Sequence, residues 1–205
     1  MRNILQAVAA LLFALPVLAQ GPGPEELVKK VTAEVMEAIQ KDKALAAGDR
    51  QKALRLAEEK VLPHVDFEEA ARLAMGRGWL QASAEQKQKL IVEFRSMLVR
   101  TYSSAIGAYQ GQQMKVLPVR MKPGDSEATV QNQYIRPGAR PVRVDYSMRK
   151  GPDGWKIYDI VVEGVSLVLT YRSEFDSVVK QEGVDALIRR LAQKNTPAAI
   201  GGTRK

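Results

Sequence analysis

Apolar residues in the first half of the chain recur every three to four positions, which is the period of an amphipathic α-helix. The pattern predicts helices that begin at Pro24, run from 49 to 61 and run from 66 to 75. Proline, acidic and glycine residues mark their ends. A capping box that begins at Ser83 predicts a longer helix, whose broad apolar stripe must be covered from more than one side. The stripe comprises Leu90, Phe94, Met97, Thr101 and Ala105.

After Gly111 the period changes to two, which is typical of β-strands with one buried face. Turns rich in proline, glycine and aspartate separate four such segments. Helical spacing returns from Val168 to Val178 and again from Val184 to Leu191. The predicted strands cover residues 113–122, 127–136, 140–149 and 155–162. The pattern therefore predicts an α+β fold with a four-stranded antiparallel sheet covered by helices.

The segment from Val161 to Phe175, VVEGVSLVLTYRSEF, contains eight large apolar or aromatic side chains. It spans the junction between the last predicted strand and the next helix. Leu167, Val168 and Leu169 point in three directions around that helix, which a helix with only one buried face does not require. The segment is therefore either buried wholly in the core, the commoner outcome for an apolar run, or it lines a cavity.

The first nineteen residues have the order of a secretory signal peptide: a basic start, an apolar run and small or modest residues before a cleavage site after Ala19. An uncleaved anchor is the alternative, although the apolar run is short for a membrane span. The chain has no cysteine, which excludes disulfides, thiol chemistry and a lipidated N-terminal cysteine. We expect an exported monomer with one domain over 20–195 and a disordered tail over 196–205.

Positive charge is concentrated in the middle of the chain. The formal net charge is +8, and residues 111–160 carry nine basic against five acidic residues. A nucleic-acid partner is disfavoured, because an exported chain without a Lys/Arg cluster and interleaved aromatics lacks the usual signature. The charge instead favours an anionic lipid or an acidic protein surface as the partner.

Candidate catalytic residues do not form a convincing set. Asp145 with Tyr146, and Asp159 with Tyr158, would suit proton transfer, but neighbours on a strand point to opposite faces. Asp145 is expected to face outward, and Asp159 to be a structural hydrogen-bonding residue. Ser166 lacks the G-x-S-x-G context of a nucleophile, and the single histidine, His64, has no second His or Cys with metal-binding spacing. We therefore expect no enzyme activity, metal site or cofactor.

The motifs in combination resemble the MlaC family, also called the toluene-tolerance family, of periplasmic phospholipid-binding proteins. The most characteristic part comprises WKIYDIVVEGVS from Trp155 to Ser166 and YRSEF from Tyr171 to Phe175. Further matches are Leu62-Pro63, Asp66-Phe67, Gly76, Trp79, Ser83, Tyr102, Tyr109, Gly111, Val144-Asp145-Tyr146 and Gly183 to Leu187. The resemblance spans nearly the whole chain beyond the leader.

The resemblance implies an NTF2-like-related fold, in which helices close a curved sheet around an apolar cavity for acyl chains. It also implies a periplasmic carrier of phospholipid, shuttling between an outer-membrane lipoprotein complex and an inner-membrane ABC transporter with an MCE-domain subunit. Such a carrier would serve outer-membrane lipid asymmetry. The alternative is a periplasmic chaperone-like or protein-binding module with a filled core.

If a cavity is present, one face of each strand and the covering helices should line it; ordinary core packing is the alternative for every such residue. The predicted lipid-binding residues are Val99, Tyr102, Ile106, Val130, Val144, Tyr146, Ile160, Val162, Val165 and Leu169. Four arginines near the outward side of the third strand could form a docking patch, although charges on a solvent-facing sheet usually serve solubility. They are Arg136, Arg140, Arg143 and Arg149.

Overall fold

The computed structural model describes residues 21–102 and 112–196. The predicted signal peptide with its cleavage site, the candidate Ile106 and the tail beyond residue 196 lie outside these residues. Within them the chain is a mixture of helices and one antiparallel sheet, which confirms the α+β prediction.

The sheet has five strands in the described residues, paired in sequence order. The strands are β1 (Gln113–Val116), β2 (Glu127–Ile135), β3 (Val142–Gly151), β4 (Gly154–Val162) and β5 (Val165–Ser166). The prediction of four strands was wrong, because a tight turn at Glu163 and Gly164 returns the chain for one further pair. Both turn residues have positive φ, 49° and 85°, as a type I′ hairpin requires. The first strand is shorter than predicted, since Pro118 has no N–H to continue it.

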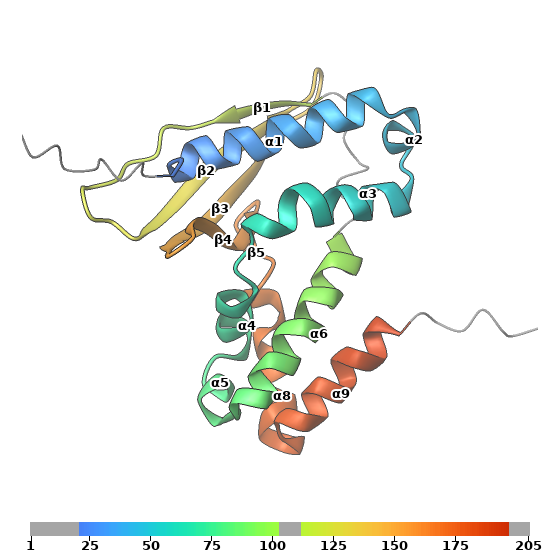
Figure 1. The fold of residues 1–205 in the computed structure, drawn as a ribbon, viewed down its shortest axis with the longest axis vertical. Helices are drawn as coiled ribbons and strands as arrows, with labels where there is room; N and C mark the ends of the chain where they lie inside the picture. Colours follow the sequence, from blue (N-terminus) through green and yellow to red (C-terminus); the bar gives the residue numbers. More distant parts are fainter. Residues whose placement is uncertain (1–20, 103–111, 197–205) are drawn as a thin grey trace, which may run out of the picture.

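The helices fall into two groups (Figure 1). The N-terminal group is α1 (Pro24–Lys41), α2 (Lys43–Ala46) and α3 (Arg50–Leu56), followed by the short helical turns η1 (Ala57–Val61) and η2 (Leu62–His64). The second group is α4 (Phe67–Met75), α5 (Gly78–Gln81), α6 (Ala84–Tyr102), η3 (Leu169–Tyr171), α8 (Arg172–Glu182) and α9 (Val184–Asn195). The predicted capping box is confirmed, since Ser83 and Gln86 exchange two hydrogen bonds of 2.9 and 3.2 Å.

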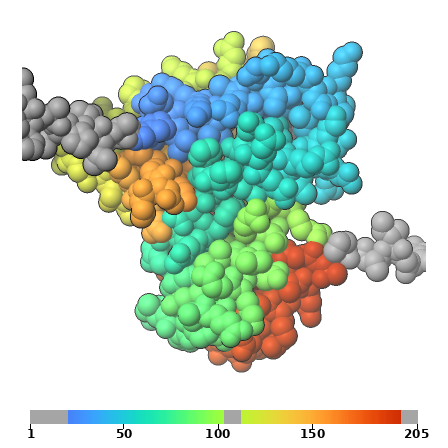
Figure 2. All heavy atoms as spheres, in the orientation of Figure 1, coloured from blue at the N-terminus to red at the C-terminus, as the bar shows by residue number. Residues whose placement is uncertain are grey.

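Two main cores follow from this division. In the first, Leu27 and Val28 of α1 pack on the inner face of the sheet, which we define as the face that α1 covers, against Val130 and Met148. In the second, α4, α5, α6, α8 and α9 pack together around Phe94. Figure 2 shows α1 to α3 as one block of atoms, with α6 and α9 in a second block below it. The sheet and the second helical group are therefore separate packing units with a joint between them.

The joint is formed where the chain enters α4. Val65 makes a parallel bridge to Ile157 on β4, and the N–H of Asp66 donates to the carbonyl of Ile157 at 2.7 Å. Asp66 also caps α4, because its carboxylate accepts from the N–H of Glu69 at 2.9 Å. Sheet and helices are thus connected by backbone hydrogen bonds as well as by side chains.

Candidate functional site

The register of the sheet collects most of the predicted lipid-binding residues on the inner face. Val144 lies opposite Val162, and Val162 lies opposite Val165, so that these three form one row across β3, β4 and β5. In the next row Val130 lies opposite Tyr146, and Tyr146 opposite Ile160. Two adjacent rows of apolar and aromatic side chains therefore share one surface, as the alternation predicted.

Burial changes steeply along this inner face. Met148 and Val130, beneath α1, are fully buried, whereas Val142 at the start of β3 is 38% exposed. Exposure reaches 59% at Val165 and 44% at Leu169. Helices thus cover one end of the sheet and leave apolar side chains uncovered at the other. An exposed apolar patch of this kind marks a binding surface more often than an isolated exposed side chain does.

The end of α6 reaches the same region. Tyr102, the last described residue of α6, shares a hydrogen bond with Tyr171 of η3, and burial together with this bond raises the pKa of Tyr102 to about 12. Tyr171 in turn contacts the ring of Phe94 edge-on, with centroids 5.6 Å apart. Tyr102 is therefore anchored close to the segment that carries Leu169, and Val99, one turn earlier, is half-buried.

A line of polar side chains crosses the inner face beside this patch. The hydroxyl groups of Tyr134 and Tyr146 lie 2.9 Å apart, and Tyr134 also bonds to Thr32 of α1. Burial raises the pKa of both tyrosines, most strongly that of Tyr146. Asn132, between them on β2, is fully buried; its amide nitrogen donates to the carbonyl of Val130 at 2.9 Å. Its Oδ1 has no hydrogen-bond partner among the described residues.

Asp159 has the structural role predicted for it. Its carboxylate accepts from the hydroxyl of Ser166 at 2.5 Å and from the backbone N–H of Val168 at 3.1 Å. Ser166 also accepts from the N–H of Leu169 at 2.9 Å. These bonds fix the chain between β5 and η3, so Ser166 is part of a turn and is not positioned as a nucleophile.

Two predicted orientations differ from the structure. Tyr158 and Asp159 were expected on opposite faces, but a bulge in β4 inserts Tyr158 into the register, and both residues lie on the outer face. The hydroxyl of Tyr158 bonds to Ser147 on that face. Asp145 lies on the outer face as predicted, yet it is buried, since Arg143 covers it with hydrogen bonds of 2.9 and 3.1 Å.

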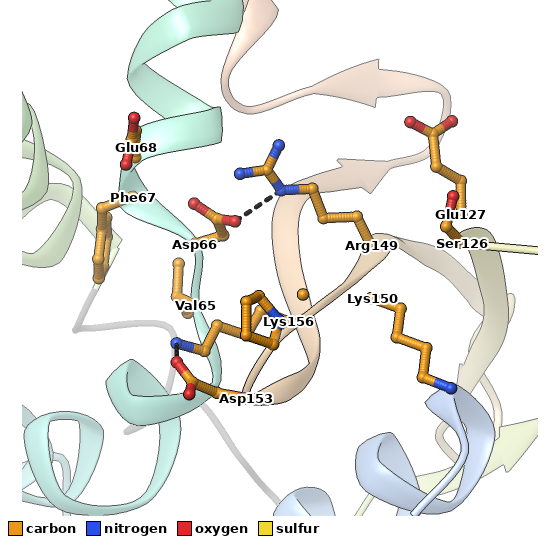
Figure 3. A pocket seen from close by; sticks show the side chains of 12 residues that line it. Val65, Asp66, Phe67, Glu68, Ser126, Glu127, Arg149, Lys150, Asp153 and Lys156 are labelled. Carbon is orange, nitrogen blue, oxygen red and sulfur yellow. Dashed lines mark hydrogen bonds and ion pairs between the residues drawn. The ribbon is translucent and has the colours of Figure 1, made fainter. Parts of the chain in front are cut away.

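The four arginines proposed for docking are in different environments. Arg143 and Arg140 lie at the surface; Arg140 pairs with Glu163 at 2.9 Å, and its side chain is 83% exposed. Arg136 is exposed in the turn after β2. Arg149 was expected to project freely outward, but its guanidinium contacts Asp66 at 2.7 Å (Figure 3) and also Glu69 at 2.8 Å. Arg149 therefore belongs to the joint between sheet and α4.

Two hollows in the surface of the described residues are polar. One, of about 620 Å³, is lined by Asp66, Arg149 and Lys156 among others (Figure 3). The other, of about 660 Å³, lies on the outer face beside Thr129 and Tyr158. Neither includes a predicted lipid-binding residue. The described residues also contain no group of three His, Cys, Asp or Glu side chains placed to hold a metal ion.

Sequence reasoning missed two acidic residues that shape the site. Glu163 has positive φ in the β4–β5 turn, and its carboxylate accepts from the backbone N–H of Arg143 and from Arg140. Glu69 is buried in the joint and is contacted by Arg72 and Arg149. The adjacent Gly164 was a usable signal for the turn at Glu163, since acidic-glycine pairs suit two-residue hairpins. No local signal identified the role of Glu69 in the joint, because Arg149, which connects it to the sheet, is far away in the sequence.

No helix of the described segments is long and apolar enough to cross a membrane.

The three comparisons with known proteins agree with one another. The MlaC family model, described as "MlaC protein", matches residues 29–193. A curated relative from Haemophilus influenzae, the intermembrane phospholipid transport system binding protein MlaC, is 23% identical; the match covers 86% of this chain and 84% of the relative.

The toluene tolerance protein ttg2D of Pseudomonas putida is 21% identical, over 88% of this chain and 84% of that protein. Among solved structures, a phospholipid-binding protein from Ralstonia solanacearum, in complex with a phospholipid, is similar with a TM-score of 0.76 and 35% identity. That match covers 85% of this chain and 97% of the Ralstonia chain. Because the family model spans most of the sequence and a solved relative is similar over 85% of this chain, the chain belongs to the MlaC family.

Proposed function

We propose that the protein is a periplasmic phospholipid carrier and not an enzyme. The observation that carries the proposal is the apolar end of the inner sheet face, where Val142 and Val165 are 38% and 59% exposed and the nearby Leu169 is 44% exposed. The Ralstonia relative was solved with a phospholipid, and two curated relatives are named for phospholipid transport and toluene tolerance. The exposed side chains are apolar, so apolar acyl chains would bury them.

We infer that eight of the ten predicted residues contact acyl chains. Val130 is fully buried beneath α1 and is better explained as core, and Ile106 stays a prediction outside the described residues. The proposed lining is Val99, Tyr102, Val144, Tyr146, Ile160, Val162, Val165 and Leu169. Their surface runs from the sheet across the β4–β5 hairpin to the end of α6.

Energetics favour a shuttle that depends on partners at each end. Two acyl chains with roughly thirty methylenes gain on the order of 24 kcal/mol when removed from water, at about 0.8 kcal/mol each. Against a bilayer, which is equally apolar, the same burial gains almost nothing. The carrier therefore holds lipid stably between membranes but cannot extract it far uphill by affinity alone. It therefore needs a docking partner at each membrane, and the family resemblance implies which: an outer-membrane lipoprotein complex and an inner-membrane ABC transporter that has an MCE-domain subunit.

The deciding experiment is organic extraction of the purified, exported protein followed by mass spectrometry. We expect phospholipid in a fixed molar ratio to protein, retained through size-exclusion chromatography. A chaperone-like module with a filled core would release no stoichiometric lipid, and that result would contradict the carrier proposal.

Docking is proposed for the surface of Arg136, Arg140 and Arg143. The double substitution Arg140→Gln with Arg143→Gln removes two positive charges without placing a new negative charge beside Asp145 or Glu163. Electrostatic attraction between a basic surface and an acidic partner acts mainly on the association rate. In this variant, lipid transfer to partner-bearing membranes should therefore slow and its salt dependence should weaken. Bound lipid should stay unchanged.

A matched control is Lys180→Gln with Arg190→Gln, which removes the same charge from α8 and α9. If both double variants slow transfer equally, net charge is sufficient to explain the effect. A wild-type rate for the Arg140 and Arg143 variant in low salt would leave that surface without a docking role.

A further inference from the structure

The polar line of Tyr134, Asn132 and Tyr146 divides the inner face of the sheet diagonally. Tyr134 and Asn132 lie on β2 in two adjacent rows of the inner face, and Tyr146 lies on β3 in the third row, opposite Val130. On one side of this line are Val130 and Met148, both fully buried beneath α1. On the other side are Val142 and Val165, which are 38% and 59% exposed. The line coincides with the boundary between filled core and uncovered apolar surface.

This polar line is also fixed in place. The hydroxyl groups of Tyr134 and Tyr146 bond to each other at 2.9 Å, and Thr32 ties Tyr134 to α1. The amide nitrogen of Asn132 donates a hydrogen bond to the carbonyl of Val130. Its Oδ1 is buried and has no hydrogen-bond partner among the described residues. An acyl methylene offers no hydrogen bond, so an acyl chain that displaced these groups would leave buried polar atoms unpaired.

We propose that Tyr146, held by Tyr134 and flanked by Asn132, is the inner wall of the acyl site and sets the length of acyl chain that the protein accepts. This inference rests on the proposed function. A chain lying along Val144 and Val162 reaches the exposed Val165 in one direction. In the opposite direction it meets Asn132, which lies opposite Val144, and the tyrosine pair beside it. A chain too long for the space must bend back or expose methylenes to water.

The test is an exchange experiment. Purified protein is equilibrated with phosphatidylglycerol vesicles that contain two acyl lengths in equal amounts, and the bound lipid is then analysed by mass spectrometry. Tyr146→Ala removes the wall. The ratio of long-chain to short-chain lipid bound to the protein, divided by the same ratio in the vesicles, should therefore rise. We expect a rise of roughly fourfold for each methylene newly accommodated, which corresponds to about 0.8 kcal/mol. Tyr146→Leu, a smaller change in volume, should shift the ratio in the same direction by less.

Met148→Ala is the matched control, because it removes a large side chain from the α1 side of the polar line. Its ratio should equal that of the wild type. An unchanged ratio in a folded, lipid-loaded Tyr146→Leu variant, or an equal shift in Met148→Ala, would overturn the wall while leaving the carrier proposal intact. A wild-type protein that takes up no lipid from the vesicles would instead contradict the proposed function itself.

Discussion

Val144→Trp is expected to empty the proposed site of lipid while the protein still unfolds cooperatively. Val144 is half-buried in the middle of the row that ends at the exposed Val165, so an indole at this position has space to extend over the uncovered surface. The ring would occupy the volume proposed for an acyl chain. Lipid content after extraction should fall to a small fraction of the wild-type value, and the urea midpoint should change little.

Val130→Trp is the informative comparison. Val130 carries the same side chain on the same face, but it is fully buried between the sheet and α1. An indole there overpacks the core, and we expect a loss of about 1 to 3 kcal/mol in unfolding free energy. If Val144→Trp destabilises the protein as much as Val130→Trp without a change in bound lipid, Val144 is a core residue and does not belong to the site.

The apolar segment from Val161 to Phe175 illustrates what a sequence can and cannot determine. Its composition left core packing and a cavity lining as alternatives, and the structure contains both kinds of environment. Val168 and Phe175 are buried in the helical core, whereas Val165 and Leu169 are largely exposed. Periodicity could not separate them, because the segment changes from strand to hairpin turn to helix within a few residues and no single period applies.

Local features were predictable because local forces determine them. Asp66, Ser83 and the period-two alternation of β2 and β3 each depend on neighbours within a few positions. Features that depend on distant partners were not predictable from the sequence. The orientation of Tyr158 depends on a bulge in the pairing of β4 with β3, which the alternation along one strand does not reveal.

Arg149 shows the same limitation with a measurable consequence. Counting alternate positions along β3 placed it on the outward face, and the charge excess of residues 111–160 suggested a free docking cation. The arginine does lie on that face, but α4 brings Asp66 and Glu69 to it, and the side chain of Glu69 is only 7% exposed. Its main role should therefore be to hold the sheet against α4.

Arg149→Glu is accordingly expected to destabilise the protein. The substitution removes a cation that contacts the carboxylates of Asp66 and Glu69, of which Glu69 is buried. It also places a third carboxylate beside them. Breaking a fully buried pair costs about 3 to 5 kcal/mol. Because the side chain of Arg149 is 38% exposed, we expect a smaller loss of about 2 to 3 kcal/mol in unfolding free energy, measured by urea denaturation.

Arg140→Glu provides the control, since it makes the same chemical change in another ion-paired arginine at the opposite end of the β2–β3 pair. Both Arg140 and its partner Glu163 are exposed, so its effect on the unfolding free energy should stay within about 0.5 kcal/mol. A large difference between the two variants would assign Arg149 to the joint and remove it from the docking surface. Equal and small effects, with slower lipid transfer in Arg149→Glu, would instead show that Arg149 acts in docking, because the ion pairs with Asp66 and Glu69 would then contribute little to stability.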